Sequence, residues 1–454
     1  MWAYITSIPP LQRTDLWSDL KTIHFPKSKS LIYFVFIYYF PSLKRIVQMR
    51  NTIESIIRFN AGLLPEIVSI KYAYMLKNMY NFYRGTCHLF YEDLEEVKKI
   101  PHSPVTWICG DLHLENFGSY KGDNRLVYFD LNDFDEAVLA PAKFELLRFV
   151  TSIFIAFDSI GIERRRATRM AQLFLKSYSE TLSKGKCTYI EYKTAKGIVA
   201  NFLQDVNKRK KIALINKRTK KYKDGRVIRT SEKHIRLDEK LKKDLCKHLS
   251  GWIQFNNVSP YNFQVTDVVF RVAGLGSLGL KRYLFLLKST NANEKYLLVD
   301  MKQARQSSVL KMRKSPPQPA WATEAHRIIS IQQRMQNVSP ALLSSTFFNG
   351  EHYMIQEMQH SKDGIRLDLI KNNYRDVYQV IHDMGLLTAS AQLRSSGRQG
   401  SAICDELIEF GQRRDWQKFV IDYSFRYSLK VKKDYAQFRR SNLVIPKKNK
   451  VVQH

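Results

Sequence analysis

Apolar positions along the chain follow two different spacings, and these predict where helices and strands lie. Between residues 53 and 97 apolar side chains recur every three or four positions, as on one face of a helix. Short apolar runs at 105–109 and 126–131 predict strands, separated by a turn at 121–124. Pro141 then begins a helix, because proline suits the first helical turn.

The second half of the chain has the same mixture of spacings. A β-rich stretch at 262–302 precedes a helical pattern at 322–336, and a strand-like run follows at 352–358. Residues 361–440 return to helical spacing. This alternation of segments predicts an α/β fold of the α+β type.

The strand at 126–131 ends in a dense acidic motif, “YFDLNDFDEA” at 128–137. Side chains of a strand alternate between its two faces. One face would be buried and would hold Val127, Phe129 and Leu131. The other face would point outward and would hold Tyr128, Asp130 and Asn132.

Composition indicates a globular chain that attracts polyanions. Of the 454 residues, 44% are hydrophobic and 25% are charged, which argues against a disordered chain. The net charge is +31, and residues 205–248 alone hold 17 Lys or Arg against 6 Asp or Glu. This segment is expected to be either a solvated basic surface or an arm that binds nucleic acid or anionic lipid.

Cysteine usage and hydropathy argue against a disulfide framework and a membrane anchor. The five cysteines include no C-x-x-C pair, which favours a reducing compartment. The strongly apolar run at 31–40 is too short to span a bilayer, so no transmembrane segment is expected. We expect this run to be buried in a core, with contact to a membrane surface as the alternative.

The motif “ICGDLHLENFG” at 108–118 places four polar side chains within six positions: Asp111, His113, Glu115 and Asn116. A transition-metal site would use the first three, but it usually recruits a second histidine, which the neighbouring sequence lacks. A polar turn is another interpretation. We favour phosphoryl transfer, with Asp111 as the catalytic base and Asn116 as a magnesium ligand.

Phosphoryl transfer needs a second carboxylate for the metal, and the acidic motif supplies it. Asp133 stands at the end of the predicted strand, so we expect it to bind magnesium, and Asp130 is the second candidate. Changing Asp111 or Asp133 to Asn is expected to abolish turnover with little loss of stability. Surface substitutions usually change the free energy of unfolding by less than about 0.5 kcal/mol.

A glycine-rich motif, “VAGLGSLGLKRYLFLL” at 272–287, supplies the candidate nucleotide-binding residues Gly274, Gly276, Ser277 and Gly279. β-like sequence stands on both sides of these glycines, whereas a dinucleotide-binding fold requires a helix after them. A plain β-turn also fits. Strand–glycines–strand is the arrangement of the kinase loop that covers the phosphates of ATP.

In kinases a strand with a phosphate-binding lysine follows this loop. Lys302 lies in such a strand, and Glu324, at the start of the next helix, is its candidate partner. The strand at 353–358 would connect two lobes and meet the adenine. Because the glycine motif follows the catalytic motif in this chain, we predict a two-lobed protein-kinase-like fold that is circularly permuted, with helical extensions.

The segment “GLLTASAQLRSSG” at 385–397 supports the permutation, because it resembles the helix before the catalytic loop of small-molecule kinases. We expect the helix at 376–394 to end beside the strand at 105–109. Over about residues 50–440 the chain resembles the domain-of-unknown-function 2252 family. Six motifs carry this resemblance in order: “FYRGTCHLF”, “GDLHLENFG”, “FDLNDFDEA”, “VAGLGSLGLKRYLFLL”, “VDMKQARQSSVL” and “IISIQQRMQ”. The resemblance implies a bacterial, cytoplasmic protein; a secreted effector or a membrane-surface location stays open.

The first polar motif is also similar to the loop H-G-D-x-H-x-x-N of aminoglycoside and choline kinases. Asp111 and Asn116 match that pattern, whereas Cys109 stands in place of its first histidine. Arg84, in the motif “FYRG”, and His113 are candidate contacts for phosphate or substrate. A structural salt bridge is the alternative role of Arg84.

The predicted function is ATP- and magnesium-dependent transfer of a phosphoryl or nucleotidyl group to an unknown acceptor. One alternative is a non-catalytic polyanion-binding protein on a degenerate kinase-like fold, and another is a metal-dependent hydrolase that does not use ATP. The expected divisions are an N-terminal extension, a helical lobe with the catalytic loops, a basic connecting segment, a β-rich nucleotide-binding lobe, C-terminal helices and a basic tail. Their limits are 1–49, 50–204, 205–254, 255–360, 361–440 and 441–454.

Overall fold

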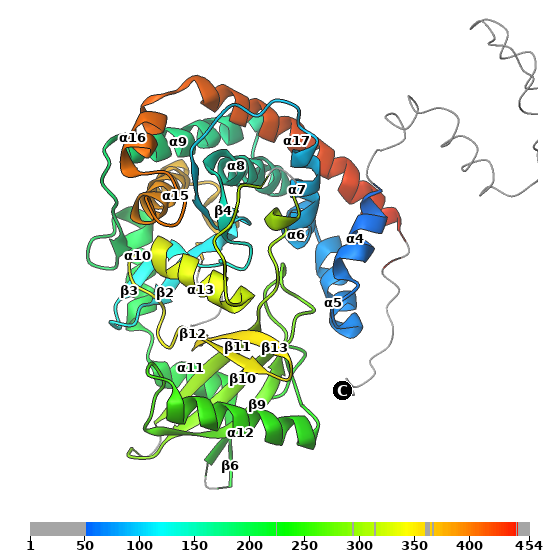
Figure 1. Cartoon of the computed structure of the whole chain (residues 1–454), viewed down its shortest axis with the longest axis vertical. Coiled ribbons are helices and arrows are strands. Elements are labelled where there is room, and N and C mark those ends of the chain that lie inside the picture. The colour runs from blue at the N-terminus through cyan, green and yellow to red at the C-terminus, as the bar shows by residue number, and fades with distance from the viewer. Residues whose placement is uncertain are drawn as a thin grey trace, which may run out of the picture. The chain divides into compact units, whose positions relative to one another are not determined.

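A computed structural model describes residues 51–443, except 224, 293–294, 313–314, 359–363, 366 and 442 (Figure 1). From Thr52 onward the described residues belong to one compact unit. The expected extension at 1–49, its apolar run at 31–40 and residues 444–454 of the tail lie outside the described residues. None of the helices in the described part has the length and apolar character that crossing a bilayer requires.

Helices form the first part of this unit, as the spacing at 53–97 predicts. Pro65 begins the second helix, and the side chain of Asn78 caps the third by accepting a hydrogen bond from the backbone N–H of Asn81. The helices up to residue 183 are α4 (Thr52–Asn60), α5 (Pro65–Leu76), α6 (Met79–Gly85), α7 (Cys87–Glu95), α8 (Ala142–Ser159) and α9 (Arg164–Ser183).

Two small antiparallel sheets carry the polar and acidic motifs. One pairs β1 with β4, and the other has the order β2–β3–β5. The predicted strands at 105–109 and 126–131 are therefore confirmed. The elements are β1 (Val105–Ile108), the short helix η2 (Leu114–Asn116), β2 (Phe117–Lys121), β3 (Val127–Leu131), β4 (Val138–Pro141) and β5 (Ile190–Glu191).

The predicted alternation along β3 is wrong. The three residues expected inside are buried, but so are Tyr128 and Asp130, which are only 3% and 2% exposed. Helix α15 (Tyr374–Arg394) packs against β3, and its Arg394 pairs with Asp130 at 3.3 Å. Both faces of the strand are thus covered, and of the residues expected outside only Asn132 is exposed.

A six-stranded antiparallel sheet forms the β-rich part, in the order β12–β13–β11–β10–β9–β8 (Figure 1). β9 and β10 form a hairpin around the glycine motif, which confirms the strand–glycines–strand prediction and excludes the dinucleotide-binding arrangement. The strands are β8 (His234–Ile235), β9 (Phe263–Arg271), β10 (Arg282–Ser289), β11 (Tyr296–Gln303), β12 (Ser344–Phe348) and β13 (Glu351–Glu357). A short helix, η3 (Val309–Lys311), follows β11.

The basic segment folds into helices and a hairpin around this sheet. Helix α12 packs on β9, and α11 packs on β11. The elements are α10 (Gly197–Lys208), α11 (Lys211–Arg218), β6 (Thr219–Tyr222), β7 (Gly225–Ile228) and α12 (Glu239–Phe255).

The remaining helices include the ones predicted at 322–336 and in the C-terminal region. α15 packs along α9, and α17 packs along α8. The loop after α15 reaches β1, where the N–H of Ala402 donates to the carbonyl of Val105 at 2.7 Å, so the helix ends beside that strand as expected. Besides α15 they are α13 (Glu324–Met335), α14 (Leu367–Ile370), α16 (Cys404–Gln412) and α17 (Asp415–Arg440).

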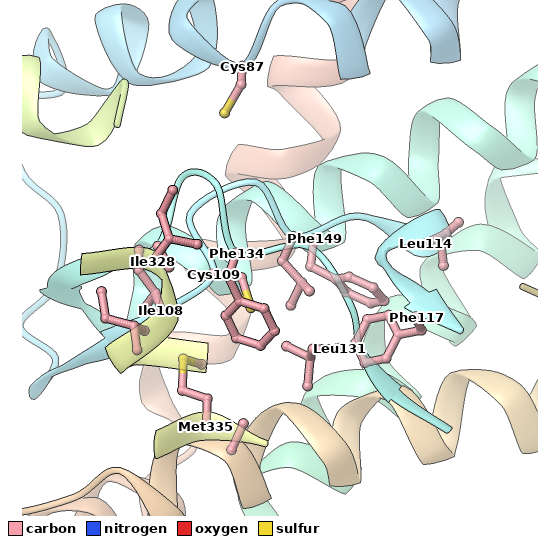
Figure 2. Packing of buried hydrophobic residues seen from close by; sticks show 14 of the residues in the cluster. Cys87, Ile108, Cys109, Leu114, Phe117, Leu131, Phe134, Phe149, Ile328 and Met335 are labelled. Atoms are coloured by element: carbon pink, nitrogen blue, oxygen red, sulfur yellow. The ribbon is translucent and has the colours of Figure 1, made fainter. Parts of the chain in front are cut away.

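The hydrophobic core reaches directly under the acidic motif. Figure 2 shows the ring of Phe134 among Ile108, Leu131 and Met335, which come from β1, β3 and α13. Phe134 is 3% exposed. Its burial anchors the loop after β3, because moving an aromatic ring out of a core costs about 3 kcal/mol.

Candidate active site

The turn after β1 brings the polar motif against the acidic motif. Gly110 begins this turn with φ +78°, in the left-handed region. A Cβ at this position would lie 2.2 Å from the carbonyl oxygen of Glu136. Only glycine therefore allows the loop that carries Asp111 to approach the loop that carries Asp133 so closely.

Changing Gly110 to Ala is expected to lower the free energy of unfolding by more than about 2 kcal/mol, because left-handed strain and a steric clash add together. Gly161→Ala is the matched control, since Gly161 has φ +75° with nothing within 4 Å of its Cβ position. Urea denaturation of the two variants measures the difference. Equal losses would contradict the tight approach of the two loops.

A buried arginine holds Asp111. Arg148, on α8, donates from Nε and Nη2 to the same carboxylate oxygen, Oδ1, at 2.9 and 2.7 Å. Its guanidinium is fully buried and lies over the ring of Tyr83, 3.7 Å from the centroid. Burial raises the pKa of Asp111, and the charge of Arg148 opposes that rise. Because Arg148 takes Oδ1, the second oxygen, Oδ2, is the one available to a substrate.

Asn116, at the end of η2, is tied to the same loop. Its Nδ2 donates to the backbone oxygen of Asp111 at 2.5 Å. Its own backbone oxygen accepts a hydrogen bond from the N–H of Asn132 at 3.0 Å, which joins the polar loop to the end of β3. With its amide nitrogen engaged, Asn116 offers its side-chain oxygen to a cation.

Carboxylates of the acidic loop line one cavity together with Asp111: Asp133, Asp135 and Glu136. Lys302, on β11, pairs with Asp135. The expected partner of this lysine, Glu324, pairs instead with Arg327 at 2.6 Å. Asp133 is exposed, but the surrounding protein displaces part of its water and thereby raises the pKa of this carboxyl, and the negative charge of Asp135 raises it further.

Arg327, a fully buried residue of α13, holds the acidic loop in place. Its guanidinium donates to the backbone oxygens of Asp135 at 2.9 Å and Arg305 at 3.0 Å, and also to that of Ala137. One side chain thus joins three segments: α13, the loop after β3 and the loop after β11. Sequence reasoning missed this residue.

The glycine loop between β9 and β10 lies directly on the loop that carries Asp111. Gly274 and Gly279 adopt φ +80° and +104°, which only glycine readily tolerates. A Cβ at Gly276 would lie 3.7 Å from Oδ2 of Asp111. The cavity between the loops has a volume of about 40 Å³, and Ser277 also lines it.

Of the other candidate residues, some line this cavity and others do not. Arg84 lines it and is held by Glu115 at 2.6 Å and by His113, whose Nε2 is 3.3 Å from the Nε of Arg84. The salt bridge expected for Arg84 as one of two roles is therefore present. Asp130 and Glu324, packed against their arginine partners, do not line this cavity.

The oxygen donors of the cavity suit magnesium in type. Within the described residues, no group of three or more His, Cys, Asp or Glu side chains is arranged to hold a metal ion. Magnesium at a phosphate site needs fewer protein ligands, because phosphate oxygens and water complete its shell. The carboxylate of Asp133, which lines the cavity, is a donor of this kind, and so is the amide oxygen of Asn116, a buried residue that does not line it.

A family model matches most of the chain. The model of a family described as “Uncharacterized protein conserved in bacteria (DUF2252)” matches residues 63–441. No curated protein and no solved structure matches the chain.

Proposed function

We propose that this chain, which belongs to the DUF2252 family of uncharacterised proteins conserved in bacteria, is a kinase-like phosphotransferase that uses ATP and magnesium. One observation carries the proposal. The oxygen of Asp111 that Arg148 leaves available faces Gly276 of the glycine loop, and Asp133 lines the same cavity. Phosphoryl or nucleotidyl transfer requires a base, a metal ligand and a phosphate-binding loop in one place.

Two features support a two-lobed, circularly permuted kinase-like fold. The six-stranded sheet with its glycine hairpin would form the nucleotide-binding lobe, and α8, α9, α15 and α17 would form the other. The loop after α15 is hydrogen-bonded to β1 through Ala402 and Val105, and the carbonyl of Arg398 accepts from Nε1 of Trp107 at 3.1 Å. If the chain began and ended at other points of the same fold, α15 could continue directly into β1 and the loop that carries Asp111. This is the order of these elements in a kinase that is not permuted.

Polar residues in the cavity and beside it have distinct roles in this proposal. Oδ2 of Asp111 orients the hydroxyl or amine of the acceptor and takes its proton, while Arg148 fixes the carboxylate. Asn116 and Asp133 would hold magnesium, which would neutralise charge on the phosphates. Arg84 and the His113 that it contacts stand where the acceptor would enter.

Nucleotide binding requires the glycine loop to move, because a cavity of about 40 Å³ is far too small for a triphosphate. Once the loop lifts, its backbone N–H groups can face the phosphates. Lys302 then exchanges Asp135 for a phosphate oxygen. Glu324 acts indirectly, through Arg327 and the acidic loop. A cytoplasmic location agrees with this proposal, since ATP is abundant there and all five cysteines are free thiols.

The test uses purified protein, magnesium and ATP labelled at either the γ or the α phosphate. We expect slow release of labelled phosphate, or its transfer to the protein, and none without magnesium. Transfer of label from the α phosphate would instead indicate nucleotidyl transfer. Absence of turnover with either label, together with absence of ATP binding, would overturn the proposal.

An exposed basic hairpin favours nucleic acid binding as a second function. Lys220, Lys221 and Lys223 of the β6–β7 hairpin are exposed, and Tyr222 among them is 56% exposed. Lysines bind the phosphate backbone, and an exposed aromatic ring can stack on a base of a single strand. The hairpin therefore suits single-stranded nucleic acid better than a lipid surface.

Changing these three lysines to Gln is expected to weaken RNA binding and to lower the slope of log affinity against log salt by about 2, at about 0.7 per phosphate contact. ATP turnover should stay unchanged. The matched control carries the same charge change at three other exposed lysines: Lys184, Lys186 and Lys193. Fluorescence anisotropy with a labelled oligonucleotide measures the affinity. Equal effects of the two triple variants on RNA binding would contradict this assignment. A hairpin variant that binds RNA normally but no longer binds anionic vesicles would also contradict it.

A further inference from the structure

Lys71, on α5, is a fully buried lysine next to the glycine loop. It is 0% exposed. Its ammonium donates to Oδ1 of Asn60 at 2.9 Å and to the backbone oxygen of Gly276 at 3.2 Å. Both partners are neutral oxygens. Within the described residues no carboxylate is in ion-pair contact with this ammonium, and Glu136 and Asp111 act on it only through space.

A buried cation without an anionic partner is in an unfavourable state. Burial lowers the pKa of Lys71 to about 7, and the neighbouring charge of Arg305 contributes to the shift. An anion brought beside this ammonium would restore the ion pair that the fold does not provide. The position of Lys71 decides which anion can reach it.

The carbonyl that Lys71 binds belongs to the residue that covers Asp111. On one side Gly276 meets Lys71 through its oxygen, and on the other its Cβ position lies 3.7 Å from Oδ2 of Asp111. The start of α5 also holds this loop: the N–H of Leu64 donates to the carbonyl of Gly279 at 3.0 Å. Phe59, in the helix before α5, lines the cavity itself. Lys71 is therefore next to the place where the transferred phosphate would lie.

We propose that Lys71 binds the terminal phosphate of the nucleotide, as a contribution of the α4–α5 helix pair to the active site. When the glycine loop lifts, the ammonium loses the carbonyl of Gly276, and a phosphate oxygen takes its place. The charge of Lys71 then stabilises the phosphate beside Asp111, while Lys302 serves the phosphates nearer the sheet. The inference rests on the proposed ATP-dependent function and adds to it a residue of helix α5.

Lys71→Gln tests this contact, because glutamine keeps a hydrogen-bond donor for the two oxygens but carries no charge. Lys77→Gln is the matched control, since Lys77 follows the same helix and is exposed. Titration calorimetry with magnesium should show ATP binding about 10- to 100-fold weaker in Lys71→Gln, as for loss of a charged hydrogen bond. ADP binding should change less than about twofold, and the control should match the wild type.

The outcomes separate this inference from the proposal on which it rests. Wild-type protein that binds no ATP overturns the proposed function. If the wild-type protein binds ATP, two results would overturn the role of Lys71 alone. In one, Lys71→Gln weakens ATP and ADP binding equally, and in the other it changes neither affinity.

A second measurement applies if Lys71→Gln does not fold. At pH 8 a lysine with a pKa of about 7 is mostly neutral, so ATP binding to wild-type protein should take up a proton and ADP binding should not. The groups that act on Lys71 are Arg305, Glu136, Asp111 and Cys87, and the difference between ATP and ADP cancels any protons that these groups exchange with both ligands. Calorimetry in two buffers of different ionisation enthalpy counts the protons. Equal uptake with ATP and ADP, or none with ATP, would contradict the inference.

Discussion

Asp111→Asn is expected to reduce ATP turnover about 10²- to 10⁴-fold and also to lower the free energy of unfolding by about 3 kcal/mol. The loss of rate follows because Oδ2 of Asp111 faces the glycine loop, where the acceptor would be deprotonated. The loss of stability follows because Arg148 is fully buried and bonds twice to this carboxylate. The sequence alone predicts little loss of stability, since it shows a loop residue and not its buried partner.

A double variant separates the two effects. Asp111→Asn combined with Arg148→Met removes the buried charge together with its partner, and this is often nearly neutral for stability. We expect the double variant to recover most of the lost stability and none of the activity. Urea denaturation and the labelled-ATP assay measure both. Activity that returned with stability would show that Asp111 has only a structural role.

Asp133→Asn is expected to abolish magnesium-dependent turnover while changing the free energy of unfolding by less than about 0.5 kcal/mol. Asp133 lines the cavity, is exposed to solvent and is repelled by Asp135, so its charge does not stabilise the folded chain. Asp123→Asn is the control, because this exposed residue of the β2–β3 turn does not line the cavity. Normal ATP turnover by Asp133→Asn at saturating magnesium would contradict the role of Asp133 as a magnesium ligand. An unfolded variant would show that Asp133 has a structural role.

The features that the sequence predicts well depend on neighbours along the chain. Short apolar runs locate β1 and β3, and the helical spacing of apolar residues locates α13. The glycine motif predicts its hairpin in the same way, since β-like residues flank it on both sides. Each of these predictions depends on a segment of fewer than about 20 consecutive residues, so it needs no knowledge of the tertiary fold.

The residues that complete the cavity were missed because their partners are remote in sequence. Arg148 holds Asp111 from α8, and Arg327 holds the acidic loop from α13. In a chain with 73 Lys and Arg, a single basic residue carries little information. One signal was available: Arg148 interrupts the apolar pattern of a helix in which nearly every residue is buried. A charge inside such a helix indicates a buried ion pair.

The predicted alternation of buried and exposed residues along β3 is wrong for a related reason. Alternation assumes that one face of a strand meets solvent, but α15 covers the second face and Arg394 neutralises Asp130 there. Burial raises the pKa of Asp130 to about 6, although Arg394 opposes the rise. Only tertiary packing decides which of the two carboxylates, Asp130 or Asp133, reaches the cavity.

The most direct test of ATP and magnesium binding is thermal unfolding of wild-type protein with ATP, with magnesium, and with both. A ligand at about 100 times its Kd stabilises the native state by about 2.7 kcal/mol, which corresponds to a rise in Tm of several degrees. If the cavity binds ATP with magnesium, Tm should rise in this way with ATP and magnesium together and rise less with ATP alone, and Asp133→Asn should lose the magnesium-dependent part. An unchanged Tm with both present at millimolar concentration would contradict this binding.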